Sequence, residues 1–423
     1  MAKKKYIQAT ICASLAVFIL FLLHHLPVNQ LFIDPFSEAI KNHDIMDVGI
    51  SRFRNHTDPS LFDNNIVILN SEKTNRKEIA EVIQYLSKSD VAGIGIDLIF
   101  DRTPHNAIDT MLSTALKSEK VVLGYTFEEM HEGETHSIHG TSSDELFVHR
   151  DEQLGYVNLA TNDGFSVRAF EPFHTIDGIQ RESFALKLAS KLNPESLKIT
   201  KDRQNKIEWI NFKRLQPGII NMAYPINDHK SVHYAFTSVN QFLIDTASYS
   251  SEYLKDKIVL IGFNGEDDDA LSMKDRYFTP LNQIYHGRSL PDMYGVVVHA
   301  NIISMLLTKD YINEIPEWIL YLIGFLIFFI NYFIFQKLED KKLFTILPLV
   351  RLVQLIQFVI LFSFCIIMIT YFNVKFGFIL IITAVIISFE VYELYDHKLR
   401  HKVSELYTTK VLKKDFSRPN NHH

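Results

Sequence analysis

Charged and imidazole side chains stand at the ends of several apolar runs, where they could hold a polar ligand. Asp97 lies in the run "VAGIGIDLIF" (residues 91–100), between Ile96 and Leu98. Because a buried carboxylate is costly unless it is paired, two interpretations are open. Asp97 is an acid at the carboxyl end of a strand, where open α/β sheets bind ligands, or a structural acid that accepts backbone hydrogen bonds.

The stretch "DRYFTP" (275–280) offers a second acid and a hydroxyl group. Asp275 and Thr279 could contribute to a polar site, or could close the loop by hydrogen bonds. Arg168 lies among the apolar residues of "GYVNLATNDGFSVRAF" (155–170) and needs a partner.

His299 and Asn301 follow the apolar run 296–298. We expect a strand at 296–299 and a helix at 300–307. His299 would then end the strand and titrate near neutral pH, unless it is a core histidine bonded to backbone. Asn301 would cap the helix, whose start could also bind an anion. We predict that Asp97, Arg168, Asp275 and His299 converge at one end of a sheet.

Other patterns argue against enzymatic chemistry. In "HEGETH" (131–136) the histidines are five positions apart, whereas a helical zinc site needs them four apart. Asp267, Asp268 and Asp269 lack the alternating pattern of a calcium loop. The sequence has no G-x-S-x-G element, P-loop or C-x-x-C motif. We therefore expect no catalytic residues, no metal, no cofactor and no enzyme.

The elements that would position these residues alternate between strands and helices, which predicts an α/β fold with a mixed sheet and flanking helices. Residues 127–153 are polar and are expected to form a loop. Asn162-Asp163-Gly164 is typical of a hairpin turn. The predicted strands are 66–69, 91–100, 121–125, 207–212, 218–223 and 257–263, and the predicted helices are 76–87, 107–118 and 184–192.

Four apolar segments are long enough, or nearly so, to cross a membrane. The chain has 423 residues, 47% of them hydrophobic, and a net charge of -6. Lysines at 3–5, around 337–342 and in the tail place both ends inside by the positive-inside rule. Both cysteines, Cys12 and Cys365, lie in these segments, so the exported domain has no disulfide. The expected organisation is a 1–27 N-terminus and anchor, a 28–315 extracytoplasmic domain, spans at 316–336, 352–372 and 376–393, a loop at 337–351 and a basic tail at 394–423.

Several motifs in this order resemble the CHASE2 domain, an extracytoplasmic sensory module of bacterial receptors. They are "VAGIGIDLIFDR", "GYVNLATNDGFSVRAF", "SFALKLA", "LKDKIVLIGF", "DRYFTPL" and "YGVVVHANIISMLL". The resemblance covers roughly residues 30–394 and implies binding of a small ligand. Arg76 is similar to a family arginine that could clamp an anionic ligand, or it pairs with Glu72 or Glu81. Asn70 stands where family members often have an acid.

The resemblance also implies a cytoplasmic output domain, which the tail after the last span is too short to form. We therefore expect a sensory subunit in a bacterial inner membrane that signals through a separate partner. The alternative is an envelope scaffold protein whose exported domain binds another protein. Membrane lipids are expected partners and nucleic acid is not.

The tail and the spans suggest two kinds of partner. Leu399, Leu406 and Tyr407 could dock a cytoplasmic protein, whereas the basic residues around them could instead hold the tail to anionic lipid. A homodimer is expected from the resemblance and from polar residues in or beside the spans, which would prefer partners away from lipid. These residues are Asn331, Gln354 and Gln357.

Overall fold

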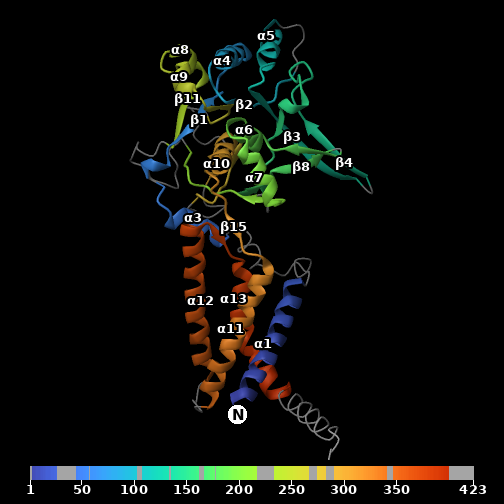
Figure 1. Cartoon of the computed structure of the whole chain (residues 1–423), viewed down its shortest axis with the longest axis vertical. Coiled ribbons are helices and arrows are strands. Elements are labelled where there is room, and N and C mark those ends of the chain that lie inside the picture. Colours follow the sequence, from blue (N-terminus) through green and yellow to red (C-terminus); the bar gives the residue numbers. More distant parts are fainter. Residues whose placement is uncertain are drawn as a thin grey trace, which may run out of the picture. The chain divides into compact units, whose positions relative to one another are not determined.

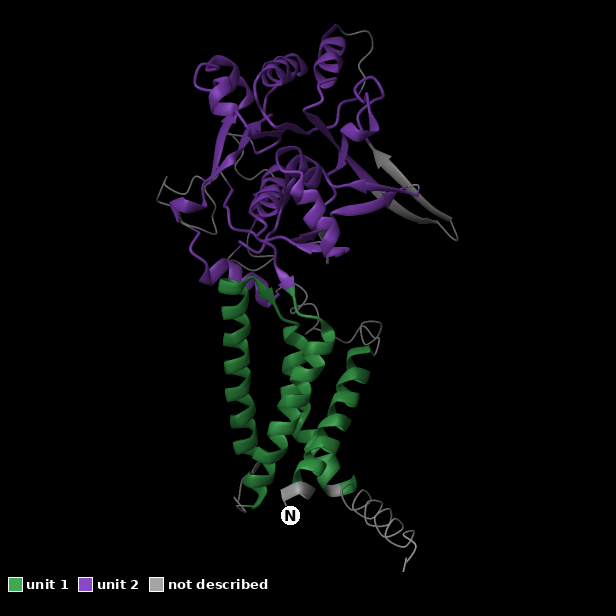
Figure 2. Cartoon of the chain, in the orientation of Figure 1, with its two compact units in different colours: residues 1–37, 314–423 green, residues 38–313 purple. Residues whose placement is uncertain are grey.

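The computed structural model separates the chain into two compact units, Met1–Ser37 with Glu314–His423, and Glu38–Asn313 (Figure 2). Each unit is described by itself. The residues whose structure is described are 2–25, 44–56, 58–101, 107–132, 135–161, 166–176, 178–216, 233–265, 274–282, 290–340 and 346–399.

The second unit is built on a seven-stranded mixed sheet, as the sequence predicts (Figure 1). All strand pairs in this sheet are parallel except the antiparallel pair β3–β4. The strand order is β11 (Tyr234–Ser238), β1 (Asp63–Asn70), β12 (Ile258–Gly262), β2 (Gly93–Asp97), β3 (Val121–Glu132) and β4 (Thr135–Thr141), with β5 (Leu154–Tyr156) also beside β3.

Strand β12 separates two strands that are neighbours in the sequence, β1 and β2. Its last residue, Gly262, is in register with Asn70 of β1 on one side and with Asp97 of β2 on the other. The three strands therefore end level, and Asp97 stands at the carboxyl edge of the sheet.

Helices cover both faces of the sheet (Figure 1). The apolar core on one face joins strands β1, β2, β3 and β12 to three helices, α4 (Arg76–Lys88), α5 (Ala107–Leu116) and α8 (Val239–Ile244). On the other face lie α6 (Phe184–Leu192) and α10 (Gly295–Thr308), which also pack against each other.

Two glycines explain how closely α6 approaches the sheet. A Cβ atom at Gly95 would lie 2.6 Å from Leu188 Cδ1, and one at Gly155 would lie 2.7 Å from the Cα of Phe184. The run Gly93-Ile94-Gly95 is thus a packing surface for a helix.

The remaining elements of this unit are short. Strands β6 and β7 form a hairpin whose turn, with Asp163, lies outside the described residues. The elements are α3 (Ile45–Phe53), β6 (Ala160–Thr161), β7 (Val167–Phe170), β8 (Phe173–Ile176), β9 (Ile179–Glu182), α7 (Glu195–Arg203), β10 (Glu208–Trp209), α9 (Ser251–Leu254), β13 (Arg276–Tyr277) and β14 (Met293–Tyr294).

Three expectations about these elements need correction. Residues 127–141 are not all loop, because β3 continues to Glu132 and pairs with β4. The second correction concerns the predicted strand 207–212, of which only Glu208–Trp209 is a strand. The predicted strand 218–223 lies outside the described residues and stays a prediction.

The third correction concerns 296–299, which is helical and not a strand. Twelve residues of α10, from Gly295 to Leu306, are buried. A helix that is buried all round has no polar face to reveal its period, so its β-branched start reads as a strand.

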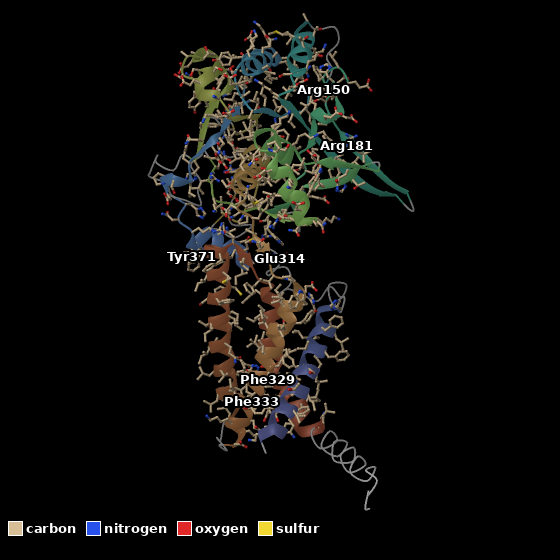
Figure 3. All side chains as sticks on the ribbon, viewed as in Figure 1. Arg150, Arg181, Glu314, Phe329, Phe333 and Tyr371 are labelled. Atoms are coloured by element: carbon tan, nitrogen blue, oxygen red, sulfur yellow. The ribbon has the colours of Figure 1, made fainter. Side chains whose placement is uncertain are left out.

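Among the residues described, the first unit contains four α-helices: α1 (Ala2–His25), α11 (Glu317–Asp340), α12 (Ile346–Phe372) and α13 (Phe378–Leu394). The other described elements are β15 (Asn313–Glu314), which begins at the last residue of the second unit, β16 (Val374–Lys375) and a π-helical turn at Tyr395–Leu399. Helices α1, α11 and α13 pack on one another. Tyr6 of α1 lies against Phe329 and Phe333 of α11, at ring-centroid distances of 6.5 and 5.4 Å. Figure 3 labels the two phenylalanines.

Three of these helices are long and apolar enough to cross a membrane: Lys5–His25, Glu317–Asp340 and Leu347–Phe372. The fourth predicted span forms α13, which has 17 residues. At 1.5 Å per residue such a helix is about 26 Å long, somewhat short of a hydrocarbon core of about 30 Å. Three of the four predicted spans therefore qualify by length and composition among the described residues, and the fourth does not.

Polar side chains of these helices bond to each other within one chain. Asn331 and Gln357 exchange two hydrogen bonds, of 3.2 and 2.6 Å, and Asn331 also donates to Ser388. Gln354 donates to the carbonyl oxygens of Val385 and Ile386. These residues consequently need no second copy of the chain to satisfy them, and they carry no argument for a dimer.

Candidate functional site

Asp97 ends the central strand β2 and is half-buried. Its carboxylate accepts no hydrogen bond from any residue that the structure describes. Its Cβ lies beside Gly262, where an added Cβ would be 3.2 Å away. Of the two interpretations of Asp97, the structural one requires backbone donors, and the described chain supplies none.

Asp275 brings a second carboxylate to this edge. Its backbone is left-handed, with φ at 53°, a conformation that costs a non-glycine residue energy and often marks a functional site. Its carbonyl accepts a hydrogen bond of 3.0 Å from Gly295, the first residue of α10. Both carboxylate oxygens would lie 2.9 Å from a Cβ placed on Gly295. Asp275 therefore lies directly over the N-terminus of α10.

The two carboxylates interact electrostatically. Burial raises the pKa of Asp97, and the negative charge of Asp275 raises it further. Burial also raises the pKa of Asp275, although a hydrogen bond with the Tyr277 hydroxyl and the charge of Lys274 favour its ionised form. Asp97 and Asp275, called the acid pair below, thus interact as like charges, with Asp97 half-buried and Asp275 exposed. Perturbed carboxyls of this kind are common at functional sites.

Tyr277 is a residue that the sequence did not single out. Burial raises the pKa of its hydroxyl, and the hydrogen bond with Asp275 adds to that shift. Its place in "DRYFTP", two positions after Asp275 and between two residues that were singled out, is the signal that could have identified it.

His299 is a buried histidine on the sheet-facing side of α10. Burial lowers its pKa to about 4, despite a hydrogen bond with the backbone of Val157. Its ring meets the Phe184 ring at a centroid distance of 5.2 Å, and its Nδ1 has no partner among the described residues. The expectation that His299 titrates near neutral pH is therefore wrong, since desolvation keeps the imidazole neutral.

Val157 connects His299 with the end of β2. A Cβ at Gly124 would lie 2.9 Å from Val157 Cγ1 and 3.6 Å from the Cα of Asp97. The structure thus brings Asp97 and Asp275 together and places His299 on the helix that starts beneath them.

Arg168 does not belong to this group. Its Nε and a terminal nitrogen donate to the Asp47 carboxylate of α3 at 2.8–3.1 Å, and both residues are buried. Burial raises the pKa of Asp47 even though Arg168 favours its charged form. The partner that Arg168 was expected to need is Asp47, a structural residue of α3. The expected convergence of Arg168 with the acid pair is therefore not found.

Arg76 is also engaged in a structural contact. Its guanidinium lies 2.7 Å from Asp109, a buried residue in the first turn of α5, and 5.7 Å from the Phe147 ring centroid. The predicted partners Glu72 and Glu81 are wrong, because the contact joins α4 to α5 and not neighbours in the sequence. Arg76 is thus committed to packing.

Thr279 closes a loop. Its backbone amide and its hydroxyl donate to the two oxygens of Asp292, at 2.8 and 2.5 Å. Burial raises the pKa of Asp292 to about 7, against the effect of these hydrogen bonds. Thr279 and Asp292 thus join the two chain segments that flank residues 283–289. Of the two roles expected for Thr279, this is the closing of a loop by hydrogen bonds.

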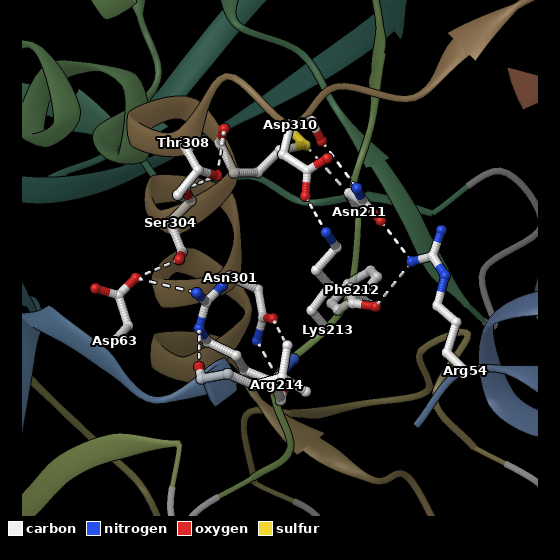
Figure 4. Close-up of polar contacts among 12 residues, drawn as sticks. Arg54, Asp63, Asn211, Phe212, Lys213, Arg214, Asn301, Ser304, Thr308 and Asp310 are labelled. Atoms are coloured by element: carbon white, nitrogen blue, oxygen red, sulfur yellow. Dashed lines mark hydrogen bonds and ion pairs between the residues drawn. The ribbon is translucent and has the colours of Figure 1, made fainter. Parts of the chain in front are cut away.

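Asn301 lies inside α10 and is not an N-cap. Its side-chain oxygen accepts from the Arg214 amide at 3.2 Å, and its nitrogen donates to the Arg214 carbonyl at 3.1 Å (Figure 4). Asn301 therefore fixes an extended segment, 210–216, against the middle of the helix.

The same segment fixes the end of α10 (Figure 4). Ser304 donates to Asp63, which also lies 3.7 Å from Arg214. Lys213 pairs with Asp310, just after the helix. Helix α10 is thus held by Asp275 at its start and by polar contacts at its other end.

Asn70 closes the neighbouring loop. Its side-chain nitrogen donates to the Gly265 carbonyl at 3.0 Å, and its oxygen accepts from the Asn264 amide at 2.9 Å. The amide here shapes the loop after β12 and adds no charge to the acid pair.

A family model for the CHASE2 domain matches residues 13–333. The chain belongs to the CHASE2 family. CHASE2 domains are extracellular sensory domains, so the sensor interpretation holds at the level of the family. No curated protein and no solved structure matches this CHASE2 chain.

The residues proposed to dock a partner fall largely beyond the described chain. Leu399 ends the turn Tyr395–Leu399 and is half-buried. Leu406 and Tyr407 lie outside the described residues.

Proposed function

We propose that this CHASE2 protein is a sensory subunit of a bacterial inner membrane, with residues 28–315 outside the cytoplasm. Its extracytoplasmic domain binds a small ligand at the acid pair and passes the signal to a separate partner. It acts as a receptor and not as an enzyme.

The observation that carries this proposal is the position of the acid pair. Asp97 and Asp275 lie at the carboxyl edge of a parallel sheet, where α/β folds bind ligands. The carboxylate of Asp97 accepts no hydrogen bond within the described chain, so it is available to a ligand that donates one. A small molecule with an amino group fits this chemistry best, because an ionised carboxylate attracts an ammonium group and accepts hydrogen bonds from its N–H groups.

Helix α10 supplies a path for the signal. It begins beneath Asp275, is buried along most of its length, and ends at Thr308, a short way along the chain from Glu317 at the start of α11. A ligand that moved Asp275 would bear on a rigid helix whose next helical neighbour in the sequence is a candidate span.

The proposed topology keeps α13 as a fourth span. Helix α13 is mainly apolar, with Glu390 and Glu393 near its end. Because it is shorter than the hydrocarbon core, snorkelling of flanking residues and local thinning of the bilayer would accommodate it. With four spans, the lysines at 3–5, at 337–342 and in the tail all lie inside. On the inner side, Leu399, Leu406 and Tyr407 would contact the partner.

The proposal can be tested with the full chain in mild detergent. Thermal unfolding is followed with a panel of single amino acids, diamines and dicarboxylic acids. An amine that raises the Tm of the wild type and leaves the Asp275→Asn variant unchanged supports binding at the acid pair. Asp101→Asn, at an exposed position four residues after Asp97, is the control and should respond as the wild type does. A compound that stabilises all three proteins equally would place the ligand elsewhere and remove this proposal.

A further inference from the structure

The chain between α10 and α11 is short and is held along its whole length. Helix α10 ends at Thr308 and α11 begins at Glu317. Residues 309–315, called the connector below, lie between them, and the boundary between the two compact units falls after Asn313. Connections between compact units are typically exposed and make few contacts. Every residue of the connector, by contrast, is either buried or in contact with another part of its own unit.

The connector begins where α10 is capped. Lys309 has a left-handed backbone, with φ at 58°, which ends the helix. The Asp310 amide donates to the Met305 carbonyl at 3.1 Å. The Asp310 carbonyl accepts a hydrogen bond of 2.9 Å from Asn211, and its carboxylate pairs with Lys213 (Figure 4). The first residues of the connector are therefore fixed to the same segment that holds α10.

Arg203, the last residue of α7, holds the middle of the connector. Its guanidinium lies 4.3 Å from the centroid of the Tyr311 ring and donates a hydrogen bond of 3.0 Å to the Asn313 side chain. Two further nitrogens of Arg203 donate to the two carboxylate oxygens of Glu208, at 2.7 and 3.0 Å. Glu208 is a buried residue of β10. One side chain thus joins α7, β10 and the connector.

Tyr311 attaches the connector to α7 a second time. Its hydroxyl lies 3.1 Å from that of Thr200, which already donates to the Ser196 carbonyl at 2.7 Å. Because a threonine hydroxyl has one hydrogen to donate, Tyr311 is the donor to Thr200. Tyr311 and Ile312 are both buried. The middle of the connector is consequently part of the packed interior of its unit.

The end of the connector is bonded within the first unit. The Ile315 amide donates to the Lys375 carbonyl at 2.9 Å, and the Glu314 carboxylate lies 3.6 Å from the Lys375 ammonium group. Lys375 ends β16, which lies between α12 and α13 in the chain. A movement of the connector would therefore act on α11 and on the turn between α12 and α13.

We propose that the connector is a stiff element, held by Arg203, through which a displacement of α10 reaches α11 and the turn between α12 and α13. A flexible linker would absorb a small displacement, whereas a segment bonded at each position passes it on. Arginine suits this role because its planar guanidinium can bind a carboxylate with two nitrogens, donate a further bond and stack on an aromatic ring. The single ammonium group of lysine cannot make all of these contacts.

This inference deepens the signal path of the proposed function and rests on that function for its biological meaning. It requires no ligand, so the two ideas can fail separately. A panel of amines without effect on the Tm would remove binding at the acid pair and would leave the stiffness of the connector unchanged.

Hydrogen–deuterium exchange of the full chain in detergent tests the connector, with the amides of Asp310 and Ile315 as the readout. Arg203→Lys should speed exchange at both amides by about tenfold, because local opening frees them, while amides of β1 and β12 stay protected. Trypsin should also cut faster after Lys309, which is exposed. Lys201→Gln is the control in the same helix, since Lys201 lies over the Phe173 ring and should respond as the wild type does.

The Ile315 amide makes the test specific. Arg203 does not contact Ile315 or Lys375 among the contacts of the described chain. Faster exchange at Ile315 therefore requires that the connector loosens as one element. A response of Asp310 alone, with Ile315 at its wild-type rate, would overturn the inference.

A double variant separates the connector from overall stability. Arg203→Met leaves the buried Glu208 carboxylate without its arginine, and adding Glu208→Gln removes that uncompensated charge. The double variant should regain most of the Tm that Arg203→Met loses. Its connector should still exchange rapidly, because Tyr311 and Asn313 do not regain their contacts with Arg203. Wild-type exchange at Asp310 and Ile315 in the double variant would show that Arg203 only stabilises the fold and would overturn the inference.

Discussion

The buried guanidinium of Arg168 meets the Asp47 carboxylate through hydrogen bonds of 2.8–3.1 Å. A buried ion pair often adds little stability compared with apolar residues, but removal of one member leaves an uncompensated charge. Arg150 and Arg181, by contrast, form ion pairs with the exposed carboxylates of Glu119 and Asp151 (Figure 3). The two kinds of arginine should respond very differently to mutation.

Arg168→Met should lower the free energy of unfolding by about 3 kcal/mol or more, because Asp47 would remain buried without its partner. Chemical denaturation of the full chain measures this. Arg150→Met is the control and should cost less than about 1 kcal/mol, since surface ion pairs are weak. Adding Asp47→Leu to Arg168→Met should restore most of the loss. If the double variant is no more stable than the single one, the ion pair is not the reason for the effect.

The acid pair predicts an unusual dependence of stability on pH. The pKa of Asp97 is higher in the folded chain than in the unfolded one, so between these two values the folded state holds the extra proton. Stability is then highest below the unfolded pKa and declines as the pH rises, by up to about 1.4 kcal/mol per pH unit for one proton. Asp97→Asn should be more stable than the wild type at neutral pH, with a smaller advantage in acid. Thermal unfolding of the two proteins across a pH series measures this, and a stability difference that does not change with pH would mean that Asp97 has the pKa of a normal surface acid.

At the scale of elements, glycines decide how α6 lies on the sheet. A Cβ at Gly95 would lie within 2.6–2.8 Å of Leu188, Leu260 and Phe184, all buried. A Cβ at Gly93 would meet Leu188 and Lys191 at 3.3 Å, and the lysine side chain is flexible.

Gly95→Ala should therefore destabilise the chain by about 1–3 kcal/mol through overpacking. Gly93→Ala is its matched control in the same strand and should cost clearly less. Chemical denaturation of the two variants gives the comparison. Equal losses would mean that glycine at both positions matters for the strand and not for the contact with α6.

At the scale of the whole molecule, the lysine distribution predicts where each part of the chain lies. A reporter fused after His423 should be active only in the cytoplasm, and one inserted near His139 only outside it. Activity of the His139 reporter outside follows if residues 28–315 are exported. Activity of the His423 reporter in the cytoplasm requires that α13 crosses the membrane, although it has 17 residues. Activity of the His423 fusion outside would show three spans, whereas exchange of both results would overturn the proposed topology.

The tail should carry the contact with the signalling partner. The wild-type chain should capture a cytoplasmic protein. Replacing Leu399 and Leu406 with Ser should abolish this capture, while insertion of the variant into the membrane remains normal. The matched variant replaces Lys402 and Lys410 with Gln. Loss of function only in the lysine variant would show that the tail is an electrostatic anchor and that the partner docks elsewhere.

The sequence by itself determined the features that depend on local pattern or composition. Buried parallel strands such as Ile258–Gly262, the amphipathic helix Arg76–Lys88 and three apolar spans could all be predicted, because each has its own period or length. The sequence also identified Asp97 and Asp275 as acids in unusual surroundings. Their places at strand ends predicted that they converge with Arg168 and His299, but not that Arg168 would pair with Asp47 instead.

Tertiary structure decided everything that depends on which residues become neighbours. Arg168 and Arg76 are both charged residues that need a partner, and only the fold assigns them to Asp47 and Asp109. Residues 296–299 have the composition of a strand, but complete burial makes them a helix, since packing outweighs intrinsic preference. The same burial keeps His299 neutral. Desolvation is a property of the assembled interior, and no window of sequence contains it.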